Sequence, residues 1–314
     1  MIRPFIKWAG GKSRVLPDLL PHLPKADCLI EPFVGGASVF LATEYRCYVL
    51  ADINPDLINL YRCLTSYTDL VIEAAQEIFE NFNDAEGYGK IRTAFNTQRR
   101  SASKCSHTLE NIGRAVRFIY LNRHCCNGVC RYSKKTGFNV PFGKYKSVYF
   151  ADNEIRLFAE KANDTKAIFL CAPFERSLQV VTGGDVLVYC DPPYLPESKT
   201  ADFTQYCTEL FTEDNHRQLV QALLEVNRKH GVKVVISNSD TETTREIYHR
   251  FRLHDIDVQR SVSTDASNSQ KAKEVIGVLK VFEGCGRAGG GRCPDCGPCA
   301  GYSMWGEAVG EEPF

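Results

Sequence analysis

The chain has 314 residues, 44% of them hydrophobic and 24% charged, and a formal net charge of zero at pH 7. These fractions are typical of a soluble globular protein that buries one sizeable core plus a smaller module. The sequence has no apolar stretch of about 18 residues, which excludes a membrane span, and no signal peptide is evident. We therefore expect a cytoplasmic protein whose 14 cysteines are reduced thiols or metal ligands.

The first motif, Trp8 to Ser13, ends in Gly-Lys-Ser, as a phosphate-binding P-loop does. The first glycine of a P-loop would fall at Ile6, and no strand of useful length precedes the motif. We therefore reject nucleoside triphosphate hydrolysis. A lysine at a helix start can instead bind a carboxylate such as that of a methionine moiety, and Lys12 is placed for this role.

Five short apolar runs predict buried parallel strands, with helical patterns between them. The runs cover residues 28–30, 48–51, 167–171, 186–190 and 232–236, and the helical patterns include residues 36–43 and 212–229. This alternation predicts an α/β doubly wound sheet. Glu31, Asp52, Asp191 and Asn238 stand where four of these strands end. Open α/β sheets bind ligands at that edge, so we expect the site there.

Residues 31–38, Glu-Pro-Phe-Val-Gly-Gly-Ala-Ser, predict a strand–turn–helix whose paired glycines let a ligand approach the backbone closely. Asp52 ends the next strand about twenty residues later and can accept hydrogen bonds from both ribose hydroxyls of a nucleoside. It can equally cap a helix that starts near Pro55. Together, the turn and Asp52 favour an adenosyl-containing ligand.

Residues 55–149 interrupt the strand pattern with helical periodicity at 57–82 and 109–121, and we expect an inserted helical module. The segment from Tyr88 to Phe150 holds thirteen Lys and Arg residues and one carboxylate, Glu110. Such a local excess is typical of a module that contacts phosphates. The alternative is a solvated basic helix face, but the local excess of positive charge favours binding to nucleic acid.

Asp191-Pro192-Pro193-Tyr194 follows the strand predicted at 186–190. The exocyclic amine of a base is a poor nucleophile because its lone pair is delocalised into the ring. A carboxylate and a backbone carbonyl that each accept one N–H localise the lone pair and aim it at a sulfonium methyl group. Prolines fix φ and add no competing N–H, and Tyr194 offers a face on which a flipped base stacks. A simple turn is the less specific alternative.

After Glu283 the composition changes to Gly, Cys and Pro, and residues 284–314 form a separate tail. Cys285, Cys293, Cys296 and Cys299 have partial zinc-site spacing. The spacing fits a zinc ribbon imperfectly, and Ser303 stands where an iron–sulfur run needs another cysteine. We favour a disordered extension without a metal. The other ten cysteines lie mostly in apolar contexts and are expected in the core.

The motifs together resemble the Dam family of DNA adenine methyltransferases. They are Phe-Ile-Lys-Trp-Ala-Gly-Gly-Lys from residue 5, Glu-Pro-Phe-Val-Gly-Gly from 31, Ala-Asp-Ile-Asn from 51, Asn-Val-Pro-Phe-Gly from 139 and Tyr-Cys-Asp-Pro-Pro-Tyr from 189. The likeness runs from about Phe5 to Val281. It implies a Rossmann-like methyltransferase sheet whose last hairpin, residues 251–258 with 275–281, is antiparallel.

The resemblance also implies the partners and the site. It implies methylation of adenine N6 in double-stranded DNA at GATC, after base flipping, by an enzyme that we expect to be a monomer without a metal. The implied catalytic residues are Asp191, Pro192, Pro193 and Tyr194, and S-adenosylmethionine would be held by Trp8, Lys12, Phe33, Gly35, Asp52 and Asp191. Residues 55–149 would be the target-recognition domain and residues 1–54 with 150–283 the catalytic domain. Lys7, Asn127, Val129, Arg131 and Pro141 match positions that touch bases, and Arg131 would read a guanine.

Two positions depart from the family pattern. Ala37 replaces the third glycine of the nucleotide loop, which we expect to preserve binding. Cys126 replaces an aromatic residue that inserts into the duplex, and since Cys cannot stack, either His124 substitutes for it or flipping is less efficient. Methylation of cytosine N4 is a rival function, and so is DNA binding by a regulator that has lost methyl transfer. The sequence leaves open whether the enzyme is a stand-alone methylase or the partner of a restriction nuclease.

Overall fold

The computed structural model describes residues 2–98, 108–133, 135–195, 211–259, 271–279 and 281, and the backbone of two short tail strands. By its internal contacts the chain divides into a first unit, Met1–Val281, and a second, Phe282–Phe314. The second unit contains β10 (Arg292–Cys293), which pairs antiparallel with β11 (Gly297–Pro298). The first unit holds all the site residues discussed below.

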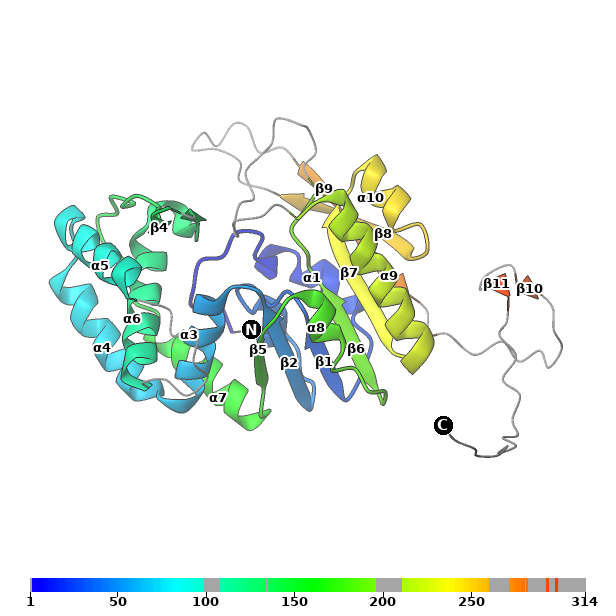
Figure 1. The fold of residues 1–314 in the computed structure, drawn as a ribbon, viewed down its shortest axis with the longest axis horizontal. Helices are drawn as coiled ribbons and strands as arrows, with labels where there is room; N and C mark the ends of the chain where they lie inside the picture. The colour runs from blue at the N-terminus through cyan, green and yellow to red at the C-terminus, as the bar shows by residue number, and fades with distance from the viewer. Residues whose placement is uncertain are drawn as a thin grey trace, which may run out of the picture. The chain divides into compact units, whose positions relative to one another are not determined.

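A seven-stranded sheet forms the centre of the first unit (Figure 1). Its strands are β1 (Cys28–Glu31), β2 (Cys47–Asp52), β5 (Ile168–Cys171), β6 (Val186–Cys190), β7 (Lys233–Ser239), β8 (Arg252–Gln259) and β9 (Lys271–Leu279). They lie in the order β5-β2-β1-β6-β7-β9-β8, with β9 antiparallel to β7 and to β8 and the other pairs parallel. This confirms the α/β methyltransferase-like sheet and its antiparallel last hairpin.

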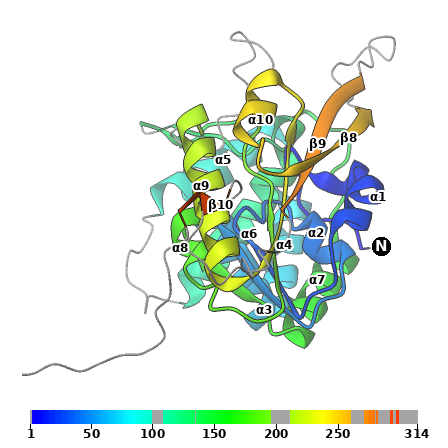
Figure 2. The same ribbon diagram turned by 90° about the vertical axis from the view of Figure 1, so that its right-hand side faces the viewer.

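Both faces of the sheet are covered by helices, and alternate residues of a strand point to opposite faces. Leu29, Leu187 and Val235 pack in one core, whereas Ile30 and Val188 pack in the other. Figure 2 shows α8 and α9 on one face and α1, α2 and α7 on the opposite face. The helices of the first face are α8 (Phe174–Leu178), α9 (Glu213–His230) and α10 (Glu242–Ile247). Those of the opposite face are α1 (Leu16–Leu19), α2 (Ser38–Ala42), α3 (Pro55–Ser66) and α7 (Asp152–Asp164), with the 3-10 turns η1 (Lys12–Arg14) and η2 (Leu20–His22).

Helix α9 shows why the sequence pattern predicted its ends so closely. Thr212 and Asn215 form a capping box, in which each side chain accepts a hydrogen bond from the backbone N–H of the other residue. Gly231 closes the helix in the left-handed conformation, at φ 63°. The observed span therefore differs from the expected residues 212–229 by one position at each end.

The inserted segment continues from α3 as a group of helices and a small hairpin. It comprises α4 (Thr68–Asn81), α5 (Ala85–Thr97), α6 (Thr108–His124), η3 (Cys126–Gly128), β3 (Tyr132–Ser133) and β4 (Gly137–Phe138). The expected helical stretch 57–82 is divided at Tyr67, whose φ of −144° and ψ of 41° are not helical. Helices α4, α5 and α6 lie beyond α3, away from the sheet (Figure 1).

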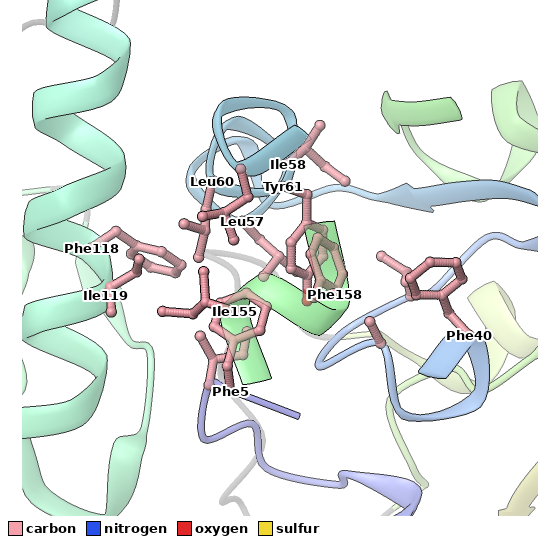
Figure 3. Packing of buried hydrophobic residues seen from close by; sticks show 14 of the residues in the cluster. Phe5, Phe40, Leu57, Ile58, Leu60, Tyr61, Phe118, Ile119, Ile155 and Phe158 are labelled. Atoms are coloured by element: carbon pink, nitrogen blue, oxygen red, sulfur yellow. The ribbon is translucent and has the colours of Figure 1, made fainter. Parts of the chain in front are cut away.

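The inserted helices share a continuous core with the layer that covers the sheet. Figure 3 shows Tyr61 of α3 beside Phe158 of α7, with Phe118 of α6 and Phe5 of the N-terminal segment close by. The Tyr61 and Phe158 ring centroids are 4.8 Å apart, and those of Phe5 and Phe158 are 5.2 Å apart. Rigid packing therefore connects α6 to the sheet. That residues 55–149 recognise DNA stays a prediction at this point.

Within the described ranges, no helix is long and apolar enough to cross a membrane.

Candidate active site

The candidate site lies at the carboxyl ends of β1 and β6, where the direction of the strand order reverses. From β1 the chain passes to β2 and then to the edge strand β5, and it returns on the other side of β1 as β6. Such a switch point is the place where open α/β sheets bind ligands, because the loops on its two sides diverge. Glu31 ends β1 and Asp191 follows β6, so the topology brings both carboxyl groups to this point.

Asp191 is held by two groups from other parts of the chain. Its Oδ1 lies 2.7 Å from Nζ of Lys12 and accepts a hydrogen bond of 3.0 Å from Oγ of Ser237 on β7. Burial raises the pKa of Asp191 above its ordinary value, although Lys12 and Ser237 act in the opposite direction. The ion pair therefore favours an anionic carboxylate inside the protein.

Lys12 also contacts the hydroxyl of Tyr194, at 2.6 Å, and its side chain is 5% exposed. The Tyr194 hydroxyl in turn donates to Oε2 of Glu274 on β9, at 2.6 Å. Glu274 and Ser237 were not predicted from the sequence. Glu274 follows Lys271 and Lys273 in β9, so its charge does not stand out there, and nothing local reveals a partner 80 residues away.

The backbone of the tetrapeptide is held on both sides. Nε2 of His216 on α9 lies 3.0 Å from the carbonyl oxygen of Pro193, and Oδ1 of Asn238 accepts from the Leu195 N–H at 3.2 Å. Burial lowers the pKa of His216 to about 4, so the imidazole is neutral and its Nε2–H donates to Pro193. Asn238 lies within β7 rather than at its end, and it supports the site instead of facing a ligand.

The glycine turn after β1 is covered by Trp8. Gly35 has a φ of +45°, and a Cβ on it would lie 2.9 Å from Cδ1 of Trp8, so only glycine fits. A Cβ on Gly36 would lie 3.0 Å from Cβ of Trp8. The half-buried ring of Phe33 packs near Phe174 and Phe211, at centroid distances of 6.0 and 5.7 Å. The turn is therefore shaped by aromatic rings on both of its sides.

Ala37 adopts the left-handed conformation, with φ 59° and ψ 28°, at the start of α2. This helix covers residues 38–42 rather than the expected 36–43, because Gly35, Gly36 and Ala37 form the turn. A left-handed Ala carries a steric cost that Gly does not have. Alanine in place of the family glycine therefore raises the energy of the backbone at this position, although the chain still turns into α2 here.

Asp52 at the end of β2 joins the glycine turn to the following segment. Its Oδ2 accepts from the Gly35 N–H at 3.1 Å and its Oδ1 from the Asn54 N–H at 2.8 Å. Asn54, not Asp52, caps α3, since its side chain accepts from the N–H groups of Asp56 and Leu57. The capping alternative for Asp52 is therefore wrong. Burial raises the pKa of Asp52 to about 6, although backbone N–H groups act against it.

Glu31 differs from the other polar groups at this edge. It is 2% exposed, and its Oε1 has no hydrogen-bond partner among the described residues. Burial raises its pKa well above the ordinary value, and the nearby charge of Asp191 raises it further. Both effects favour the protonated form of Glu31, whereas the Lys12 contact favours the anionic form of Asp191.

The five residues expected to touch bases lie on connected segments around Asn122 of α6. The Asn122 side chain accepts from the Lys7 N–H at 2.9 Å and donates to the Lys7 carbonyl at 2.7 Å and to the Gly128 carbonyl at 3.2 Å. The Cys126 N–H donates to the carbonyl of Pro141, at 2.9 Å. These bonds bring together Lys7, Asn127, Val129, Arg131 and Pro141, of which Asn127, Arg131 and Pro141 are exposed.

Two cations of the basic segment have structural roles. Arg114 is buried and binds Asp56, with Nε 2.5 Å from Oδ1 and Nη2 3.2 Å from Oδ2. Arg123 is half-buried, and its Nη1 lies 3.4 Å from the Phe5 carbonyl oxygen. The basic excess of the sequence therefore overstates the charge that can face phosphates.

His124 is buried and does not take the place of the missing aromatic residue, so this one of the two alternatives is wrong. Its side chain is fully buried and stacks on Tyr120 at a centroid distance of 3.9 Å, and its Nδ1 lies 2.9 Å from the Tyr120 carbonyl oxygen. Cys126 is exposed at the start of η3. Only Cys126 of this pair can face DNA.

The cysteines follow the core expectation in part. Cys63, Cys125, Cys130 and Cys190 are buried, Cys28 and Cys47 are partly buried, and Cys126 and Cys171 are exposed. Among the described residues, no group of three or more His, Cys, Asp or Glu side chains could hold a metal ion. The side chains of Cys285, Cys293, Cys296 and Cys299 lie outside the described part of the chain.

The sheet order and the site at its switch point define a Rossmann-like methyltransferase. The chain belongs to the D12 class of N6 adenine-specific DNA methyltransferases, whose family model matches residues 8–262. It is 44% identical to a DNA adenine methylase of Escherichia coli (strain K12) over 279 residues, which is 88% of this chain and 95% of the relative. A DNA adenine methylase of Serratia marcescens is 42% identical, covering 88% and 98% of the two chains, and one of Vibrio cholerae serotype O1 is 41% identical, covering 88% and 96%.

The family membership confirms the resemblance seen in the sequence. The protein is an adenine-specific DNA methyltransferase, and it acts at adenine N6 rather than at cytosine N4. Its class implies DNA as the substrate and S-adenosylmethionine as the methyl donor.

Proposed function

We propose that the enzyme methylates adenine within GATC in double-stranded DNA, after flipping the base out of the helix, and that it acts as a monomer in the cytoplasm. One observation supports the reaction centre above all others. Asp191 lies half-buried at the end of β6, paired with Lys12, in a tetrapeptide whose backbone is fixed by His216 and Asn238. A fixed acceptor for an amine N–H is what transfer to a delocalised lone pair requires.

The donor site fits the adenosyl and methionine parts of S-adenosylmethionine. Gly35 and Gly36 leave the turn without side chains beside Trp8, and Asp52 places a carboxylate at the adjacent strand end. We assign Asp52 to the ribose hydroxyls, Trp8, Phe33 and Gly35 to the walls, and Lys12 to the methionine carboxylate. When bound, the donor supplies an electrophilic methyl group on a sulfonium sulfur.

The chain's own residues orient the amine. Asp191 accepts one N6–H, and the Pro192 carbonyl accepts the other, since the Pro193 carbonyl is bound by His216. Two acceptors favour a pyramidal nitrogen with its lone pair directed at the methyl carbon. The Tyr194 ring stacks on the base. After transfer the aminium nitrogen loses one proton to Asp191 or to water, and no stronger base is required.

We assign recognition of the DNA sequence to the connected segments around Asn122. Arg131 would bind O6 and N7 of one guanine, and Lys7 would reach the other. In this state Nε of Arg131 donates to Oδ1 of Asn139 at 2.9 Å, and Nζ of Lys7 lies 4.2 Å from the centre of the Tyr145 ring. Asn127, Val129 and Pro141 complete the surface.

The deciding experiment incubates the protein with labelled methyl donor and duplexes with and without GATC, and identifies the modified base. We expect N6-methyladenine only in duplexes that contain GATC. Asp191→Ala should abolish transfer and leave DNA binding largely intact, whereas Glu246→Gln, on the exposed face of α10, should change neither. Transfer to sites other than GATC would contradict the proposed specificity, and binding without transfer would favour a regulator.

A further inference from the structure

Three short contacts connect four side chains from three segments of the chain in the active site. Lys12 lies 2.7 Å from Asp191 and 2.6 Å from the Tyr194 hydroxyl, which lies 2.6 Å from Glu274. Lys12 and Glu274 are both buried. Such a group of charges, withdrawn from water, is stable only when its members satisfy one another.

We propose that Glu274 is a positioning residue for methyl transfer, which fixes the Tyr194 ring from its hydroxyl end. Tyrosine has one phenolic proton, and the geometry directs it to Oε2 of Glu274 while the oxygen accepts from Lys12. Burial raises the pKa of Tyr194 well above its ordinary value, so this proton stays on the phenol. A ring held at both its Cα and its hydroxyl cannot swing about χ1 away from the base that it stacks on.

The location of Glu274 on the sheet supports this role. Glu274 pairs with Ser239 across β7 and β9, and Oγ of Ser239 donates to the Leu195 carbonyl at 2.9 Å. The same two strands therefore hold the backbone just after Tyr194 and the hydroxyl of Tyr194. This double attachment makes the ring part of the rigid sheet rather than part of a loop.

The anchor remains when Lys12 changes partner. The inference rests on the proposed function at this point, because binding of a methionine carboxylate by Lys12 would weaken the contacts of Lys12 with Asp191 and Tyr194. Glu274 then keeps Tyr194 in place without help from Lys12. The lysine can serve the donor while the stacking surface stays fixed.

The test compares Glu274→Ala, Glu274→Gln, Tyr194→Phe and the double variant Glu274→Gln/Tyr194→Phe with the wild-type full chain. Single-turnover methylation of a GATC duplex is measured at saturating donor, with donor affinity measured separately. Loss of a hydrogen bond to a charged group corresponds to about a 10- to 100-fold loss of rate for Glu274→Ala. We expect a smaller loss for Glu274→Gln, whose amide oxygen still accepts, and less than about a threefold change in donor affinity for either.

The double-mutant cycle separates positioning from a general structural effect. If Glu274 acts through the Tyr194 hydroxyl, adding Glu274→Gln to Tyr194→Phe should cause little further loss. A 2-aminopurine at the target position should show weaker stacking in Glu274→Gln and in Tyr194→Phe, seen as a changed fluorescence of the flipped base. Glu246→Gln is the matched control, because its exposed carboxylate binds Arg217 at 3.1 Å, and it should retain wild-type values.

The pH profile gives a further readout. Asp191 is faced by Lys12 of η1, Glu31 of β1, Ser237 of β7, Glu274 of β9, and Tyr189 and Tyr194 of its own segment. The charge of Glu274 raises the pKa of Asp191, so Glu274→Gln should move the acid limb of the rate profile to lower pH.

Wild-type rates in Glu274→Ala, or additive losses in the cycle, would overturn the inference. So would a loss of donor affinity that matches the loss of rate. If wild type itself fails to methylate GATC, the proposed function fails instead, and the two failures are thereby distinguished.

Discussion

A half-buried tyrosine hydroxyl on the small hairpin is expected to contribute to stability. The Tyr132 hydroxyl on β3 donates to Oδ2 of Asp56 at 2.8 Å, and the same carboxylate binds Arg114. The Asp56 and Arg114 side chains are 2% and 9% exposed, so water cannot replace a lost partner easily. Tyr132→Phe removes this one hydrogen bond and keeps the ring.

The magnitude follows from the charge of the acceptor. A hydrogen bond to a charged group contributes about 1.5–3 kcal/mol, and the lower half of this range applies because Tyr132 is only partly buried. We therefore expect Tyr132→Phe to lower the free energy of unfolding by about 2 kcal/mol. With an m-value of about 3 kcal/mol/M, the urea midpoint falls by roughly 0.7 M.

The chain offers a matched control for this substitution. The Tyr149 hydroxyl also donates to a carboxylate, that of Glu154 at 2.9 Å, but Tyr149 is 59% exposed. Urea unfolding followed by circular dichroism should place Tyr149→Phe at the wild-type midpoint, because water replaces the lost bond. Equal midpoints for Tyr132→Phe and Tyr149→Phe would refute the claim that burial gives the Tyr132 bond its strength.

Three other predictions concern the donor site and the DNA surface. Ala37→Gly should raise the free energy of unfolding by about 1 kcal/mol in thermal melts, because glycine removes the left-handed strain; a lower melting temperature would contradict this. Cys126→Tyr should raise the methylation rate on duplex but not on an already unpaired substrate, and equal effects on both would count against a role in flipping. Since the pKa of Asp52 is about 6, the dissociation constant for S-adenosylmethionine should rise as the pH falls below about 6, as the anion that accepts ribose hydroxyls is lost. Asp52→Asn should weaken binding at pH 8 and flatten this pH dependence, which calorimetry at several pH values measures. If the dissociation constant of wild type does not depend on pH, Asp52 is not the group that accepts the ribose hydroxyls.

The sequence predicted the parts of the fold that local patterns encode. Apolar runs ending in Glu31, Asp52 and Asp191 predicted parallel strands, which the structure confirms. The site predicted at their carboxyl ends stays a prediction. The capping box and Gly231 defined α9 because these signals lie within a few residues of the helix ends. The ordered motifs then indicated the family, which the comparisons confirm.

Long-range contacts could not be predicted in the same way. Glu274 and His216 act on the tetrapeptide through strand register and helix packing, which involve residues far apart in sequence. Arg114 was counted among the cations available to phosphate, yet it is buried against Asp56, 58 residues earlier. His124 ends an amphipathic helix, and only the packing of α6 shows that its ring points inward.

Lys7 and Trp8 are neighbours in sequence with different surroundings. The backbone of Lys7 is bound by Asn122, among the segments assigned to base reading, and Trp8 covers Gly35 in the turn assigned to the donor. A single peptide bond therefore joins the segment assigned to base reading to the segment assigned to donor binding. Lengthening the chain by one residue between them would put both out of register at once, whereas substitutions at Arg131 or Pro141 leave the donor side untouched. Variation in sequence preference is thus easier to acquire on η3 and the hairpin than in the N-terminal segment, which any redesign of specificity should leave at its present length.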